Sequence, residues 1–255
     1  MRLRSTVFGR GPRGVVFLHG FTGGGASFSH LEPVLGDEVR ARCLVLPGHE
    51  DAAPPAARGE AGFREAVAAI AEELGEGATL VGYSQGARLA LAVAALHPAK
   101  VGALVLEGVH PGLADAQERQ SRRDEDEARA RALETEGLEA FLAQWEQHPV
   151  LAGQRGLRPE LSATLAAQRR RHSAQGLAGA LRSLGLAAQP ALPLELVRGP
   201  VLLLSGAEDA KFTALAQHLA LQLRGARHVA IAGAGHSPHL EAPEAYARAV
   251  RDFLR

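Results

Sequence analysis

Residues 81–86 read VGYSQG and place Ser84 between two glycines, at the junction of two sequence patterns. The residues before it, 78–83, form a short apolar run typical of a buried strand, and residues 86–98 (GARLALAVAALHP) carry apolar side chains at helical spacing. A serine in Gly-x-Ser-x-Gly between a strand and a helix predicts a sharp, strained turn that lifts the hydroxyl group above the end of the sheet. A side chain at either glycine position is expected to collide with the neighbouring helix or strand.

Short aliphatic runs alternate with helical patterns along most of the chain, which predicts an α/β fold with a mostly parallel sheet flanked by helices. An antiparallel edge strand is expected at residues 2–9. The predicted buried strands lie at residues 14–20, 42–48, 78–84, 101–108, 201–209 and 228–235. The predicted crossover helices lie at residues 63–75, 86–98, 213–223 and 243–255.

Residues 111–193 interrupt this alternation, because they contain helical patterns and no strand-like run. We expect an inserted helical cap here, between a first part of the core at residues 1–110 and a second part at residues 194–255. The charged run within residues 118–145 is interpreted as a solvated helix face.

The composition limits the classes of partner. The 255 residues, 46% of them hydrophobic, are enough for one sizeable core, and 28 basic and 28 acidic residues give a net charge of +0. Without a general field we expect a small-molecule partner, and neither nucleic acid nor membrane. A single cysteine, Cys43, excludes an intrachain disulfide and a cysteine-rich metal site. No stretch resembles a signal peptide or a membrane span, so we expect a cytoplasmic protein, a monomer or a small homo-oligomer.

An exposed serine needs a base and an acid that orients the base. Asp209 ends one predicted strand and His236 follows another, so both are expected beside Ser84 at the carboxyl edge of the sheet, in the chain order serine, acid, histidine. Asp209 could instead cap the helix that follows it, and Glu107 is a rival acid. The other histidines considered for the base are His19, His49, His110 and His239.

Two backbone N–H groups are expected to stabilise negative charge on a reacting oxygen. One is the N–H of Gln85, at the start of the helix after the serine, and the other is the N–H of Phe21 in residues 19–28 (HGFTGGGASF). Glycines let this loop approach a ligand closely, and His19 is interpreted as a support beneath it.

With these motifs in place, the chain resembles α/β-hydrolase-fold proteins over essentially its full length. It also resembles, more narrowly, the 2-succinyl-6-hydroxy-2,4-cyclohexadiene-1-carboxylate synthases of menaquinone biosynthesis. The narrower resemblance rests on GYSQGARLALAVAALHP (82–98), VLEGVHPGL (105–113), FLAQWEQHPVLAG (141–153), LRSLGLAAQPAL (181–192), SGAEDAKF (205–212) and GAGHSPHLEAPE (233–244).

That family is not a hydrolase. The resemblance implies elimination of pyruvate from 2-succinyl-5-enolpyruvyl-6-hydroxy-3-cyclohexene-1-carboxylate, with Ser84 as a base activated by His236 and Asp209, and with no metal or organic cofactor. A serine hydrolase (an esterase, thioesterase or carbon–carbon bond hydrolase) in which Ser84 is acylated is the alternative. A non-catalytic binding module is disfavoured, because such a protein is expected to lack a member of the triad.

A substrate that carries several carboxylates requires cations. Arg88 lies one helical turn after Ser84 in an otherwise apolar helix, where an arginine must either extend to solvent or serve the pocket. The family pattern GYSxGxR matches Arg88 and favours substrate binding. A second arginine is expected from residues 118–126, where Arg123 or Arg119 is preferred over Arg122. By resemblance, the remaining candidates for the pocket are Trp145, Tyr83 and Lys211.

Overall fold

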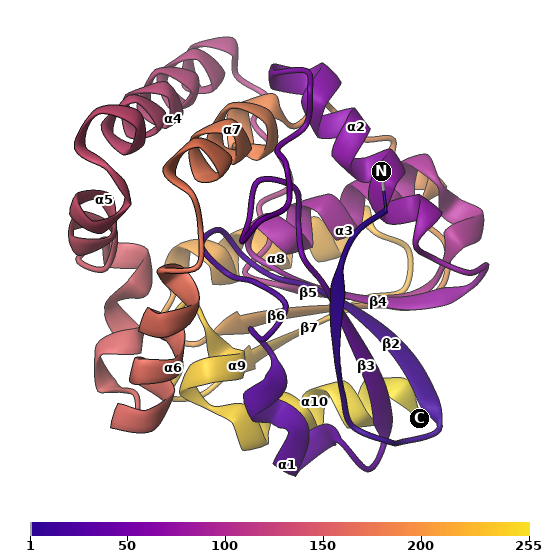
Figure 1. Ribbon diagram of the computed structural model, residues 1–255. Coiled ribbons are helices and arrows are strands. Elements are labelled where there is room, and N and C mark those ends of the chain that lie inside the picture. The colour runs from indigo at the N-terminus through magenta and orange to yellow at the C-terminus, as the bar shows by residue number, and fades with distance from the viewer. Residues whose placement is uncertain (1) are drawn as a thin grey trace.

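The computed structural model describes residues 2–255 and contains one seven-stranded sheet with the strand order β1-β3-β2-β4-β5-β6-β7 (Figure 1). Strand β1 is an antiparallel edge strand beside β3, and all other neighbours are parallel. The α/β class and the edge strand are therefore confirmed. The strands are β1 (Ser5–Phe8), β2 (Arg13–Leu18), β3 (Val39–Leu44), β4 (Ala78–Tyr83), β5 (Val101–Glu107), β6 (Val201–Gly206) and β7 (Ala226–Ile231).

Helices cover both faces of the sheet (Figure 1). Alternate residues of the central strands enter two separate apolar cores: Leu104 and Leu106 of β5 join one, and Val105 joins the other. This two-sided burial explains why the strands read as continuous aliphatic runs. The first core is covered by α2 (Gly59–Glu72), α3 (Gln85–Leu96) and α8 (Ala210–Gln222), and the second by α1 (Glu32–Leu35) and α10 (Pro243–Leu254).

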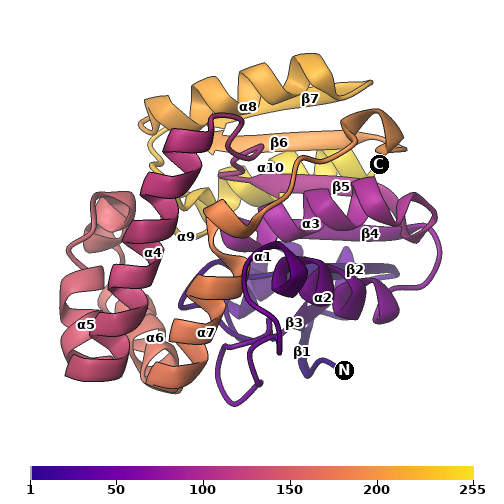
Figure 2. The ribbon, with the colours of Figure 1, turned by 90° about the horizontal axis from the view of Figure 1, so that it is seen from above.

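Residues 111–193, called the cap segment below, are all described and contain helices and turns but no strand. They lie beyond one end of the strands (Figure 2) and have an apolar cluster of their own, which includes Leu133, Phe141 and Leu177. Only three of the 21 residues of α4 are buried, in agreement with a largely solvated charged helix. The helices are α4 (Ala116–Glu136), α5 (Leu138–Trp145), α6 (Pro159–Arg169) and α7 (Ala174–Leu184), with 3-10 turns at Pro149–Gly156 and Leu186–Ala188.

The remaining helical elements are short. Within residues 2–255, no helix combines the length and the hydrophobicity that a bilayer span requires. The short helical elements not yet named are α9 (Pro238–Glu241) and 3-10 turns at Ser29–Leu31, Pro98–Lys100 and Leu194–Leu196.

The two glycines that flank Ser84 occupy positions where a side chain does not fit. A Cβ atom added at Gly86 would lie 2.2 Å from the carbonyl oxygen of Leu18, and one added at Gly82 would lie 2.5 Å from the carbonyl oxygen of Gly86. The expected collisions with the neighbouring strand and helix are therefore confirmed.

Because the obstacle at Gly86 is backbone, we expect Gly86→Ala to lower the free energy of unfolding by about 3 kcal/mol, the upper end of the usual cost of overpacking. The matched control is Gly75→Ala, since nothing lies within 4 Å of a Cβ added there, and we expect a change within about 0.5 kcal/mol. Urea unfolding followed by circular dichroism measures both. Equal losses in the two variants would contradict the packing argument.

Candidate active site

Ser84 joins the end of β4 to the start of α3 with backbone angles φ 51° and ψ −109°. A positive φ is uncommon for a residue with a side chain and costs on the order of 1–3 kcal/mol. The turn is held on both sides, because the Ser84 N–H donates to the Glu107 carbonyl oxygen at 2.8 Å and the Ser84 carbonyl oxygen accepts from the Arg88 N–H at 3.1 Å. The structure thus has the strained turn that the sequence predicts.

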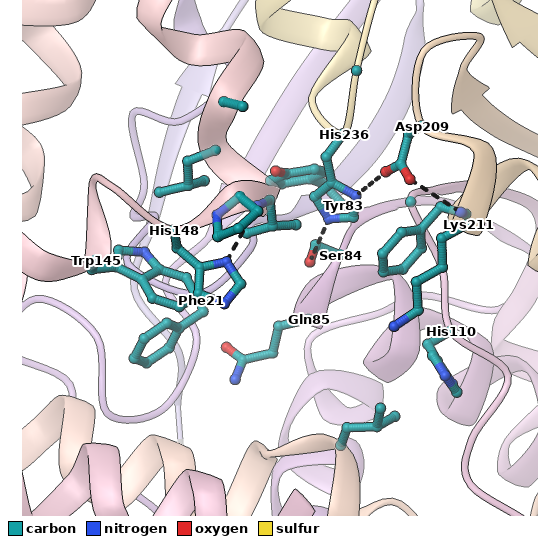
Figure 3. A pocket seen from close by; sticks show the side chains of 18 of the residues that line it. Phe21, Tyr83, Ser84, Gln85, His110, Trp145, His148, Asp209, Lys211 and His236 are labelled. Carbon is teal, nitrogen blue, oxygen red and sulfur yellow. Dashed lines mark hydrogen bonds and ion pairs between the residues drawn. The ribbon is translucent and has the colours of Figure 1, made fainter.

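His236 lies between Ser84 and Asp209 (Figure 3). Its Nδ1 is 2.9 Å from Asp209 Oδ2, and its Nε2 is 3.2 Å from Ser84 Oγ. An ionised carboxylate can only accept a hydrogen bond, so Nδ1 carries the proton and the Nε2 lone pair faces the serine hydroxyl. This is the arrangement in which an imidazole can take the serine proton.

Asp209 makes both of the contacts that the two interpretations require. Oδ1 accepts from the Phe212 N–H at 3.2 Å and caps α8, while Oδ2 binds His236. Burial alone would raise the pKa of the Asp209 carboxyl, but the hydrogen bonds from His236 and from the Phe212 N–H outweigh it and hold the pKa below its usual value. The carboxylate form is therefore favoured.

The rival acid and one rival base form a pair of their own. Glu107 is fully buried, and its Oε1 accepts from the His239 N–H at 3.0 Å and contacts His239 Nδ1 at 2.7 Å. Tyr83 separates this pair from the triad, with its ring centroid 4.6 Å from that of His239 and 5.6 Å from that of His236. In the described part of the chain, neither the Glu107 carboxylate nor the His239 imidazole has a hydrogen bond to the Ser84 hydroxyl group.

His19 supports the loop that carries Phe21. The Leu46 N–H donates to His19 Nε2 at 3.0 Å, so the proton lies on Nδ1, which donates to the Gly20 carbonyl oxygen at 2.8 Å. The same oxygen accepts from the Gly23 N–H at 3.0 Å. A trans peptide points its C=O and N–H in opposite directions, so these two bonds turn the Phe21 N–H away from His19.

Among residues 2–255 the Phe21 N–H has no hydrogen-bond acceptor. The Gln85 N–H lies in the first turn of α3, where a helical N–H has no partner within the helix. Both residues line the same cavity as Ser84. Their use as a pair of charge-stabilising donors stays a prediction.

A cavity of about 640 Å³ lies between the sheet and the cap segment, and it joins most of the predicted residues. Tyr83 forms part of its wall and its hydroxyl group bonds Ser237 Oγ at 2.7 Å. The Trp145 ring packs 5.3 Å from the Phe21 ring, centroid to centroid. Of the predicted triad, donor and substrate residues, those on the cavity are Ser84, Asp209, His236, Phe21, Gln85, Arg88, Tyr83, Trp145 and Lys211.

The two preferred cap arginines are not on the cavity, and Arg122 is. Arg119 instead directs its guanidinium at backbone carbonyl oxygens, among them that of Gln189 at 2.7 Å, and Arg123 is exposed to solvent. Arg122, Asp126 and Arg129 share one face of α4 at the spacing i, i+4, i+7, and all three line the cavity. This spacing is visible in the sequence and could have identified Arg122.

The charges in the cavity are unequally compensated. Asp126 is buried and accepts from Arg122 Nε at 3.0 Å and from Arg129 at 3.3 Å. Arg88 is only 7% exposed and donates to neutral oxygens, including the Leu184 carbonyl at 2.6 Å, and no carboxylate of residues 2–255 forms an ion pair with Arg88 or Lys211.

Nearby cations act on His110, another rival base that lies on the cavity wall. Burial, together with the charges of Arg88, Lys211 and Arg122, lowers the pKa of His110 to about 4.

No group of three or more His, Cys, Asp or Glu side chains among residues 2–255 is arranged to hold a metal ion.

A serine on a strained strand-to-helix turn, with an acid and a histidine from the loops after β6 and β7 of a mostly parallel sheet, defines a class of protein. Comparison with known proteins identifies that class. The chain belongs to the alpha/beta hydrolase family, which matches residues 15–249.

Particular relatives within this family cover nearly the whole chain. The putative 2-succinyl-6-hydroxy-2,4-cyclohexadiene-1-carboxylate synthase of Bacillus subtilis is 35% identical over 99% of this chain and 95% of its own length. The synthase of the same name from an Enterobacter species is 36% identical over 94% of this chain and 91% of its own length. The structure of MenH from S. aureus superimposes with a TM-score of 0.90 and 28% identity, over 98% of this chain and 97% of that one.

We predict that Asp209, and not Glu107, supports the reactivity of Ser84. Asp209→Asn keeps an oxygen that can cap α8 but removes the charge that orients His236, so the rate at which a fluorophosphonate labels Ser84 should fall on the order of 10³- to 10⁴-fold. Glu107→Gln should lower the melting temperature and change the labelling rate less than about tenfold. The reverse ranking would assign the acid to Glu107.

Proposed function

We propose that this protein is a lyase that eliminates pyruvate from 2-succinyl-5-enolpyruvyl-6-hydroxy-3-cyclohexene-1-carboxylate to form 2-succinyl-6-hydroxy-2,4-cyclohexadiene-1-carboxylate. The names of its full-length relatives support this assignment. The observation on this chain that carries it is Arg88, a buried cation on the cavity wall beside Ser84 that has no carboxylate partner among residues 2–255.

A buried guanidinium without an ion-pair partner is costly to the fold, because the charge of Asp126 offsets only part of the desolvation that lowers the pKa of Arg88. Its retention is explained if an anion from outside the chain completes the pair. The substrate of the proposed reaction carries carboxylates, which match the planar fork of an arginine. We assign Arg88 to one carboxylate, with Arg122 and Lys211 facing the same space.

The proposed reaction begins at ring carbon C2, whose proton is acidic because it lies next to the succinyl ketone and beside the ring double bond. Ser84 Oγ removes this proton as His236 Nε2 takes the serine proton, and Asp209 stabilises the imidazolium that forms. The electron pair forms the C2–C3 double bond, the C3–C4 double bond shifts to C4–C5, and the bond from C5 to the enolpyruvyl oxygen breaks. The released enolate takes up a proton on its methylene carbon and becomes pyruvate.

During proton removal, negative charge moves onto the ketone oxygen. We assign the N–H groups of Phe21 and Gln85 to this oxygen, where each donor of such a pair is typically worth about a hundred- to a thousandfold in rate. In this scheme Ser84 is a base throughout and forms no acyl-enzyme.

The proposal predicts that Arg88→Met lowers kcat/KM for pyruvate release by about 10- to 100-fold, the worth of a hydrogen bond to a charged group. Because methionine replaces a buried unpaired charge with apolar volume, the melting temperature should stay within a few degrees or rise. The matched control is Arg123→Met, which removes an exposed arginine outside the cavity and should retain wild-type turnover.

Pyruvate release from the enzymatically generated substrate, coupled to lactate dehydrogenase, measures both variants. Full activity of Arg88→Met would contradict the assignment of this residue to the substrate. No release by the wild type above the spontaneous rate would contradict the lyase itself and favour the hydrolase alternative, which a burst of product from an activated ester would then support.

A further inference from the structure

The cap segment reaches the loop that carries Phe21 through one buried histidine. His172 follows α6, is 6% exposed and contacts two backbone groups of the core. The Glu50 N–H lies 2.7 Å from Nδ1, and the Thr22 carbonyl oxygen lies 3.0 Å from Nε2. A backbone N–H can only donate, so Nδ1 is the acceptor and Nε2–H donates to Thr22. Burial lowers the pKa of His172, which favours the neutral ring that both contacts require.

Thr22 has a backbone conformation that threonine rarely adopts. Its φ is 62°, and it is the second central residue of the turn that the Gly23 N–H closes onto the Gly20 carbonyl oxygen at 3.0 Å. A positive φ at this place in a turn favours glycine, and a β-branched residue there costs on the order of 1–3 kcal/mol. The surrounding contacts must therefore hold the turn in shape.

Two peptide groups connect His172 to the Phe21 N–H. The first joins Thr22 to Gly23: its C=O accepts from His172, and its N–H points the opposite way and donates to the Gly20 oxygen. The second joins Gly20 to Phe21: its C=O accepts that bond, and its N–H points the opposite way. Each group is planar, so fixing the Thr22 oxygen restricts the direction of the Phe21 N–H.

We propose that His172 is a positioning residue for the reaction at Ser84, which it serves by fixing the direction of the Phe21 N–H from the cap segment. The inference rests on the role of Phe21 as a charge-stabilising donor in the proposed function. A second contact from the cap segment supports it: Gln168 Nε2 donates to Ser27 Oγ at 2.7 Å, and that oxygen accepts from the Gly24 N–H at 2.9 Å. The cap segment thus contacts the loop at two points, Thr22 and Ser27.

The test compares His172→Leu with His172→Gln. Leucine removes the donor to Thr22, whereas glutamine keeps an N–H donor at the ε position. In His172→Leu the Phe21 N–H is still present but no longer fixed in direction, so the loss in rate should be smaller than for complete removal of this donor. We therefore expect His172→Leu to lower kcat for pyruvate release about 10- to 100-fold, with KM within about threefold of the wild type. His172→Gln should remain within about threefold of the wild type in both constants. The control His218→Leu removes an exposed imidazole on α8 and should have no effect.

Labelling of Ser84 by a fluorophosphonate gives a second readout that does not depend on the physiological substrate, since the phosphonyl oxygen also develops negative charge that the same donors stabilise. The labelling rate should fall in His172→Leu and recover in His172→Gln. If His172→Leu does not fold, His172→Asn replaces it. Asparagine keeps an acceptor at the δ position and lacks the donor at the ε position, so kcat and the labelling rate should fall as predicted for His172→Leu.

The proposal would be overturned if His172→Leu, or His172→Asn in its place, kept the wild-type labelling rate and kcat. It would also be overturned if His172→Gln were as slow as the variant that lacks the donor. An increase in KM alone would also overturn it, because it would mean that His172 shapes the binding site and not the donor. If the wild type released no pyruvate, the proposed reaction would fail, while the relative labelling rates would still decide the role of His172.

Discussion

The active site depends on a close backbone approach between the start of α3 and the end of β2. The space beside Gly86 is filled by the carbonyl oxygen of Leu18, so the serine turn and the loop after β2 cannot move independently. This contact sets Ser84 next to the loop that carries Phe21, at a turn whose φ of 51° stores strain. The parallel sheet then brings Asp209 and His236 to the same edge, because both follow neighbouring strands.

The cations and carboxylates that line the cavity are equal in number but unevenly paired: Arg88, Arg122, Arg129 and Lys211 face Glu125, Asp126, Glu208 and Asp209. Asp209 binds His236, and Asp126 binds Arg122 and Arg129, whereas Arg88 donates only to neutral oxygens. The composition therefore says little about the site, since the total counts both the paired and the unpaired charges. In the proposed function, the buried arginine without an ion-pair partner is what would distinguish this cavity from a generic esterase pocket.

The sequence predicts the parts of this structure that local patterns determine. The strands, the edge strand and the serine turn follow from aliphatic runs and from Gly-x-Ser-x-Gly, and the expected neighbourhood of Ser84, Asp209 and His236 follows from strand ends that share one sheet edge. The dual contact of Asp209 also has a local origin, since a residue that starts a helix at a strand end can both cap the helix and face the site. The divisions at residues 110 and 193 stay a prediction.

What the sequence does not predict depends on side-chain direction or on distant segments. Arg119 and Arg123, which the sequence favours, do not line the cavity, because packing against α7 sets the phase of α4 and leaves Arg122 on the cavity wall. His172 lies 150 residues from Thr22 in the chain, and no local pattern links a cap histidine to a loop carbonyl. Contacts of this kind hold the backbone of the loop that carries Phe21, and only the folded chain contains them.

The most direct measurement of the role of Ser84 is the mass of the intact enzyme, acid-quenched during steady-state turnover, with pyruvate quantified in the same sample. If Ser84 is the base, pyruvate accumulates over many turnovers while the enzyme keeps its unmodified mass, because Ser84 exchanges only a proton with the substrate. A covalent adduct that peptide mapping places on Ser84 would contradict it and make this residue a nucleophile.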